Sequence, residues 1–211
     1  SLWLCRLPRH AWPRSVRSPL RRTHRHGRSR ARAPSYTNDQ LVAVIRHGIK
    51  RDGTSTLAMP ANAFSSMADA DIANVIAWLR GLKPDTDTIK KHTSAGPIGR
   101  ILALTGDLRI SARVPQDPAP PIAAPTDPIA HGEYLVKVVC ADCHGVDQPH
   151  QVEPGLVAPP LREMVQAYDL DQFRHLMRDG KGAGERELRL MSNVARAGFS
   201  KMTDDEIAAV H

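Results

Sequence analysis

Two stretches in the first half of the chain have the apolar spacing of amphipathic helices. One has apolar residues at positions 41, 44, 45 and 49, and it predicts a helix that begins at Asn38 or Asp39 as N-cap and ends near Gly48. The other has its apolar stripe at positions 72, 75, 76 and 79, and it predicts a helix over residues 69–82. A polar loop over residues 52–60 lies between them.

The second half of the chain shows a similar succession of patterns. We expect a helix over residues 130–140, another over 168–180, and a final helix that begins at Thr203. Glu206 follows Thr203 by three residues, which is the spacing of a capping box. Residues 146–160 contain several prolines and are expected to form a loop.

The two halves also match residue by residue. Gly48 and Met59 are eleven residues apart, and so are Gly180 and Met191, at an offset of 132 positions. Residues 64–73 match a later segment at an offset of 135, so that the second copy holds three additional residues. The sequence therefore predicts two copies of one domain, the first represented by its C-terminal half.

A linker is expected between the copies. It contains a short apolar run within residues 96–108, which is too brief to span a bilayer because a spanning helix needs roughly 20 residues. Prolines follow at positions 115, 118, 120, 121, 125 and 128 and favour an extended, semi-rigid spacer. We therefore divide the chain into a partial first domain (36–83), a linker (84–128) and a second domain (129–211).

Residues 1–35 differ in composition from the rest. They contain ten arginines, no lysine and no acidic residue, and their apolar positions follow neither a helical nor a strand period. Subtracting these ten charges from the net charge of +7 leaves −3 for the other 176 residues. The basic character is therefore local, and we expect no nucleic-acid partner. The segment is either a disordered basic arm or an out-of-frame reading.

The clearest chemical motif is Cys140-Ala141-Asp142-Cys143-His144. This spacing is the attachment signature of haem c, in which both thiols form thioethers to the haem vinyl groups and the adjacent imidazole becomes the proximal iron ligand. A thioredoxin-type site would require a preceding strand, which the pattern does not predict. A zinc site would require a second pair of ligands, and the only other cysteine is Cys5. A structural zinc or disulfide module is the alternative.

With this motif the chain resembles the class I-like cytochrome c family, and the tandem repeat is similar to di-haem cytochrome subunits of periplasmic dehydrogenases. The resemblance implies an all-α fold and one haem c in the second domain, with another only if the first domain is intact. It also implies a methionine as sixth iron ligand. Met191 is the expected distal ligand, and Met59, in a Met-Pro pair, is its counterpart in the first copy. Ser192 replaces that proline. Met164, Met177, Met202 and His175 are the alternatives to Met191.

Iron with His/Met ligation has no open position for a substrate, so we expect an electron carrier rather than an enzyme. The resemblance implies redox protein partners, such as a dehydrogenase subunit or a terminal oxidase. It also implies a location in the bacterial periplasm or on the outer face of the inner membrane, with any membrane association encoded outside these residues. If Met191 is not a ligand, a five-coordinate haem sensor or peroxidase is the alternative.

The repeat suggests an origin for the unusual N-terminal segment. The offset of 132 places a first haem motif near residues 8–12. Residues 4–9, back-translated with GC-rich codons and read one base later, encode Cys-Ala-Ala-Cys-His. We therefore hypothesise that residues 1–35 are an out-of-frame reading of the first haem domain, which the coding nucleotide sequence would decide. The chain stops at His211, before the counterpart of Trp78, so we expect a truncated last helix.

Overall fold

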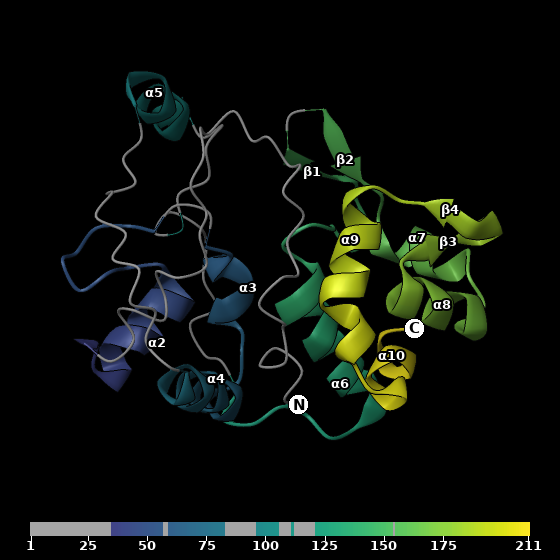
Figure 1. Ribbon diagram of the computed structural model, residues 1–211, viewed down its shortest axis with the longest axis horizontal. Helices are drawn as coiled ribbons and strands as arrows, with labels where there is room; N and C mark the ends of the chain where they lie inside the picture. Colours follow the sequence, from purple (N-terminus) through teal and green to yellow (C-terminus); the bar gives the residue numbers. More distant parts are fainter. Residues whose placement is uncertain (1–34, 57–58, 83–95, 106–110, 112–120, 154) are drawn as a thin grey trace. The chain divides into compact units, whose positions relative to one another are not determined.

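A computed structural model describes residues 35–56, 59–82, 96–105, 111, 121–153 and 155–211. These residues fall into two compact units, one ending at Ala123 and one running from Ala124 to His211 (Figure 1). Both units are mainly helical, as the sequence predicts, and the described residues also form two small antiparallel sheets. In the described part of the chain, no helix has the length and apolar character needed to cross a bilayer. The expected domain boundaries stay a prediction.

The first unit contains helices α2 (Asn38–His47), α3 (Ala61–Ser65), α4 (Asp69–Gly81) and α5 (Pro97–Thr105). The N-cap of α2 is Thr37, so the expected cap at Asn38 or Asp39 is wrong. The Thr37 side chain accepts a hydrogen bond from the Gln40 amide at 3.2 Å, and the Thr37 amide donates to the Gln40 side chain at 3.0 Å. Only a cap at position 37 places a glutamine three residues later, and this reciprocal pairing stabilises the helix start. The predicted helix over 69–82 is confirmed by α4.

The second unit begins with α6 (Pro128–Leu135), which continues as the π-helix η4 (Val136–Cys140), so the helix expected over 130–140 is confirmed with a change of geometry. The loop expected over 146–160 contains a hairpin instead, because β1 (His150–Glu153) pairs with β2 (Leu156–Ala158). The remaining elements are α7 (Leu161–Gln166), α8 (Leu170–Asp179), β3 (Lys181–Gly182), η5 (Ala183–Glu185), β4 (Arg186–Glu187), α9 (Leu190–Ala197), η6 (Phe199–Lys201) and α10 (Asp204–Val210).

Helix termini in the second unit follow the sequence signals. Asp169 caps α8 in a capping box with Gln172, and Gly180 ends the same helix in the left-handed conformation. The Thr203 side chain accepts from the Glu206 amide at 3.1 Å, and the Thr203 amide donates to the Glu206 carboxylate at 2.8 Å. The predicted capping box at the start of α10 is therefore confirmed.

Several contacts occur in both units at positions that the sequence match pairs. Arg46 donates to the carbonyl of Ser65 at 3.4 Å and to the Asp69 carboxylate at 2.6 Å. Arg178, its counterpart 132 positions later, donates to the carbonyl of Ser200 at 2.8 Å and to the Asp204 carboxylate at 2.7 Å. In each unit, one arginine thus connects the helix before the expected methionine ligand to the start of a later helix, α2 to α4 in the first unit and α8 to α10 in the second.

The backbone after each cap glycine also matches. Gly48 and Gly180 both adopt the left-handed conformation, with φ of 63° and 69°. The antiparallel pairing that follows joins Ile49 to Ser55 in the first unit, and it joins Lys181 to Glu187 in the second. These pairs are again separated by 132 positions. The backbone therefore forms an antiparallel pairing with the same register after α2 and after α8.

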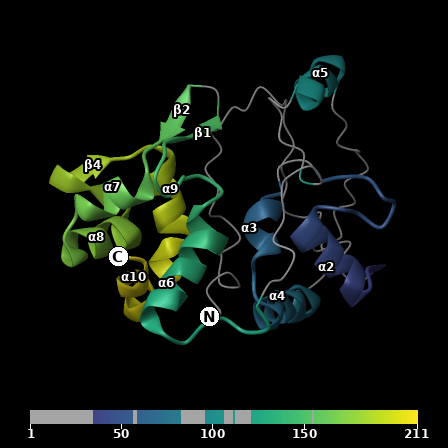
Figure 2. The ribbon, with the colours of Figure 1, turned by 180° about the vertical axis from the view of Figure 1, so that it is seen from behind.

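The core of the second unit depends on a close approach between α6 and α10, which pack against each other (Figure 2). A Cβ atom at Gly132 on α6 would collide with the backbone carbonyl of Ala209 on α10. Only glycine permits this approach, since every other residue would push the two helices apart. The side chains buried around these helices are Tyr134, Leu135, Val138, Phe173, Leu176, Met177 and Ile207.

We predict that Gly132→Ala lowers the free energy of unfolding of the second unit by about 1–3 kcal/mol, the range for overpacked cores. The loss should appear although alanine is the better helix former. Thermal unfolding followed by circular dichroism measures it. Gly81→Ala is the matched control, because Gly81 is also helical and a Cβ there meets nothing within 4 Å. Equal melting temperatures for Gly132→Ala and the parent would contradict the predicted collision.

Candidate functional site

The Cys-x-x-Cys-His motif forms a single tight turn. The π-helix η4 ends at Cys140, and the amides of Cys143 and His144 both donate to the Cys140 carbonyl, at 3.1 Å and 3.0 Å. Two thiols and an imidazole therefore project from one short stretch of backbone that follows a helix directly. This is the local geometry that two thioether bonds and a proximal ligand require.

The imidazole of His144 is oriented by a backbone carbonyl. Its Nδ1 lies 2.9 Å from the carbonyl oxygen of Pro159. A carbonyl oxygen can only accept, so Nδ1 carries the proton, and the lone pair of the neutral ring lies on Nε2. Hydrogen bonds of this kind fix the tautomer and ring orientation of metal-binding histidines. The donor set of this turn thus fits a haem iron at Nε2.

The segment that provides the carbonyl is itself fixed to the residues after the motif. The amide of Leu161 donates to the Gly145 carbonyl at 2.9 Å, and the amide of Arg162 donates to the Val146 carbonyl at 3.1 Å. Both amides belong to the first turn of α7, where backbone donors have no partner within the helix. The start of α7, just after Pro159, is therefore bound by backbone contacts to the two residues that follow His144.

Cys140 and Cys143 are reduced, and no disulfide joins them in the described part of the chain. Removal from water raises the pKa of the Cys140 thiol to about 12, and the neighbouring Cys143 adds to the rise. Cys140 therefore keeps its proton at neutral pH. A protonated thiol is a poor metal ligand, whereas thioether formation adds the S–H group across a vinyl double bond. Within the described residues, no three His, Cys, Asp or Glu side chains converge on a metal position.

Met191 is the second residue of α9 and is partly exposed. The alternatives Met177 and Met202 are each only 2% exposed and belong to the core. Met164, on α7, is partly exposed. In the first unit, Met59 is partly exposed and its carbonyl accepts from the Ser111 hydroxyl at 2.8 Å. Iron coordination by Met191 and Met59 stays a prediction.

His175 is engaged at both ring nitrogens. Nδ1 lies 2.8 Å from the Asp179 carboxylate and Nε2 lies 2.9 Å from that of Glu185. Hydrogen bonds that the His175 ring donates to Glu185, the larger effect, and to Asp179 raise the pKa of His175 above its ordinary value. His175 thus holds the segment between α8 and β4 in place. This role gives no support to its use as an iron ligand.

Comparison with known proteins gives relatives of one kind. The chain is 25% identical over 195 residues to the fructose dehydrogenase cytochrome subunit of Gluconobacter japonicus, a match covering 83% of this chain and 40% of that subunit. It is 33% identical over 114 residues to the cytochrome c subunit of the quinone alcohol dehydrogenase from Gluconacetobacter polyoxogenes, covering 52% of this chain and 24% of that subunit. The chain is a relative of dehydrogenase cytochrome subunits.

The corresponding subunit of Komagataeibacter europaeus matches with the same identity and coverage as that of Gluconacetobacter polyoxogenes. The chain spans less than half the length of each of these relatives. No family model matches it. The resemblance to cytochrome subunits that the Cys-x-x-Cys-His motif and the repeat indicate is thus confirmed at low identity.

Replacing both motif cysteines tests covalent attachment. We predict that Cys140→Ser combined with Cys143→Ser abolishes haem staining on denaturing gels after expression with the haem-attachment machinery, because a hydroxyl does not form the thioether. Cys5→Ser is the matched control and should stain like the parent, since Cys5 lies outside the motif and outside the described residues. Undiminished staining of the double variant would exclude thioether attachment at this turn.

The raised pKa of His175 predicts a pH-dependent contribution to stability. The contribution is fully present below the ordinary value of 6.5 and is lost as pH rises through the raised pKa of the folded state. We therefore expect His175→Gln to lower the free energy of unfolding at pH 5.5 and to have a smaller effect at pH 8.5. Denaturant unfolding at the two values measures this, and an effect of the same size at both would contradict it.

Proposed function

We propose that this chain is an electron-transfer c-type cytochrome and carries no catalytic site of its own. The observation that carries the proposal is the hydrogen bond from His144 Nδ1 to the Pro159 carbonyl, beside two reduced thiols in one turn. It directs Nε2 toward ligation. The similarity to cytochrome subunits of dehydrogenases supports the same function. Haem c bound here would supply one-electron chemistry at its iron.

The protein's own residues have separate roles in this proposal. Cys140 and Cys143 would hold the haem covalently, each by adding its S–H group across one vinyl group. His144 would hold the iron through the lone pair on Nε2, and the Pro159 carbonyl keeps its imidazole in the tautomer that places the lone pair there. The apolar side chains of α6, α8 and α10 form the buried core of the unit that carries this turn. The protein thereby binds and orients the group without touching a substrate.

We assign the sixth iron position to Met191 in the second unit. A neutral thioether stabilises Fe(II) and raises the potential, which suits a carrier that accepts electrons from a dehydrogenase. Its place at the start of α9, outside the buried core that holds Met177 and Met202, supports this choice. Met59 is assigned the same role in the first unit.

We also propose that the two units are tandem cytochrome c domains. The contacts of Arg46 and Arg178, and the pairing after Gly48 and Gly180, support a common fold for the segments that contain the two methionines. One haem c is expected in the second domain. The first domain would hold a second haem only where its own Cys-x-x-Cys-His motif is present.

The partner is proposed from the relatives. They are subunits of fructose and alcohol dehydrogenases, so we propose that this chain receives electrons from a dehydrogenase subunit and passes them to a further redox protein, such as a terminal oxidase. The matching compartment is the periplasm or the outer face of the inner membrane, because c-type haem is attached outside the bacterial cytoplasm in the family that the chain resembles.

Met191→His tests the distal ligand. The iron should stay six-coordinate, but the more basic imidazole favours Fe(III), so the reduction potential should fall by several steps of about 59 mV, each a factor of ten in equilibrium constant. Redox titration measures the fall, and the ferric sulfur-to-iron absorption band near the red end of the spectrum should disappear.

Met202→His is the matched control, because Met202 is 2% exposed and packs in the core. It should lower stability and leave the band intact. Loss of the band in Met202→His together with its survival in Met191→His would move the ligand to Met202. A high-spin ferric spectrum with ready carbon monoxide binding in the parent would instead indicate a five-coordinate sensor or peroxidase.

A further inference from the structure

The residues just before Met59 and just before Met191 are hydrogen-bonded to the glycine that ends the preceding helix. The two units make this connection differently. In the first unit the amide of Thr56, three residues before Met59, donates directly to the Gly48 carbonyl at 2.6 Å. In the second unit the corresponding residue, three before Met191, is Leu188. Its amide donates to the hydroxyl oxygen of Ser192 at 2.7 Å.

The Ser192 hydroxyl then donates to the Gly180 carbonyl at 2.5 Å. Gly180 is the counterpart of Gly48. The Ser192 hydroxyl therefore lies between the Leu188 amide and the Gly180 carbonyl, whose counterparts in the first unit bond directly to each other. Residue 60, the counterpart of Ser192, is a proline without a hydroxyl. The replacement of proline by serine after the methionine therefore coincides with a change in how the segment is fastened.

The bridge is buried and closely packed. Ser192 is only 1% exposed. Gly180 has a φ of 69°, and a Cβ atom there would lie 2.5 Å from the Ser192 carbonyl oxygen and 2.9 Å from its Cα. Water has little access to such a site, so removing the hydroxyl would leave the Leu188 amide and the Gly180 carbonyl without this partner. An unsatisfied buried polar group is costly.

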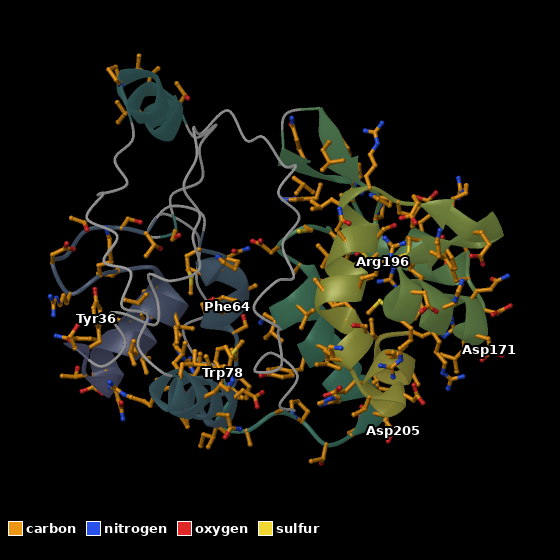
Figure 3. The ribbon with its side chains drawn as sticks, viewed as in Figure 1. Tyr36, Phe64, Trp78, Asp171, Arg196 and Asp205 are labelled. Carbon is orange, nitrogen blue, oxygen red and sulfur yellow. The ribbon has the colours of Figure 1, made fainter. Side chains whose placement is uncertain are left out.

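The bridge also spans a strained residue. Arg189, between Leu188 and the start of α9, has φ of 49° and ψ of −114°, an uncommon conformation for a residue with a Cβ. Strain of this kind persists only where surrounding contacts enforce it. Ser192 supplies such a contact from one side. Arg196 of α9, labelled in Figure 3, donates to the Asp179 carbonyl at 2.7 Å and to the Glu187 carboxylate at 2.6 Å.

We propose that Ser192 is a positioning residue for the sixth iron ligand, and that its hydroxyl holds the start of α9 where Met191 can reach the iron. The inference rests on the proposed His/Met ligation. Ser192 itself contacts neither haem nor iron in this proposal. It acts by joining Leu188 to Gly180, and so by limiting the movement of the backbone that carries the thioether.

Competition by imidazole measures this role. An added ligand binds the ferric iron only in the fraction of molecules whose methionine has dissociated, so its apparent affinity rises with that fraction. We expect Ser192→Ala to raise the apparent imidazole affinity by roughly tenfold, the effect of losing about one buried hydrogen bond. Ser192→Thr retains a hydroxyl and should bind imidazole within about twofold of the parent. Met191→Ala gives the upper limit.

The matched control is Ser200→Ala. The Ser200 hydroxyl also donates to a backbone carbonyl, that of Arg196 at 2.8 Å, at the end of α9 away from Met191. It should therefore leave imidazole affinity unchanged. All variants are made in the full chain with haem attached, and haem staining and circular dichroism establish that each is loaded and folded. Hydrogen exchange at the Leu188 amide should be faster in Ser192→Ala alone.

The outcomes separate this proposal from the one it rests on. A parent with the sulfur-to-iron band and a Ser192→Ala variant with parental imidazole affinity would overturn the positioning role and leave His/Met ligation intact. A parent without the band would overturn both. If Ser192→Ala does not fold, Ser192→Thr decides: affinity equal to that of Met191→Ala contradicts the role, and parental affinity supports it.

Discussion

One hydrogen bond, from His144 Nδ1 to the carbonyl of Pro159, is the constraint on which the site depends. It selects the tautomer, and it requires that a loop fifteen residues further along the chain return to the motif. That return is secured by the first amides of α7, which bond to the carbonyls of Gly145 and Val146. The hairpin of β1 and β2 lies within the intervening segment.

A feature of the site can be predicted from the sequence when it depends on particular side chains, and it cannot when it depends on backbone groups that every residue has. Two features depend on side chains and can be predicted from the sequence: the spacing of Cys140, Cys143 and His144, and the capping box at Thr203. The Pro159 carbonyl cannot be predicted in this way, because every residue has one. For the Ser192 bridge, the sequence shows only that serine follows Met191 where proline follows Met59. It does not show that the Leu188 amide and the Gly180 carbonyl both bond to the Ser192 hydroxyl.

The contacts of Arg46 and Arg178 give a physical reason why these arginines and their aspartate partners match between the two copies. Arg46 is 5% exposed and donates to two backbone carbonyls as well as to Asp69. A planar guanidinium with several fixed donors can satisfy such a set of acceptors, and lysine cannot do so in the same geometry. Arg178 donates to Ser200 and Asp204, the counterparts of Ser65 and Asp69, so the paired arginines and aspartates retain a common arrangement around methionine segments of unequal length.

The approach of Gly132 to Ala209 joins helices from opposite ends of the second unit. The contact therefore links two residues that are 77 positions apart in the sequence (209 − 132). The long-range contact closes late, since it must await nearly the whole unit and its loop-closure entropy. Folding of the second unit is therefore expected to be limited by closure of this long loop rather than by formation of its short helices.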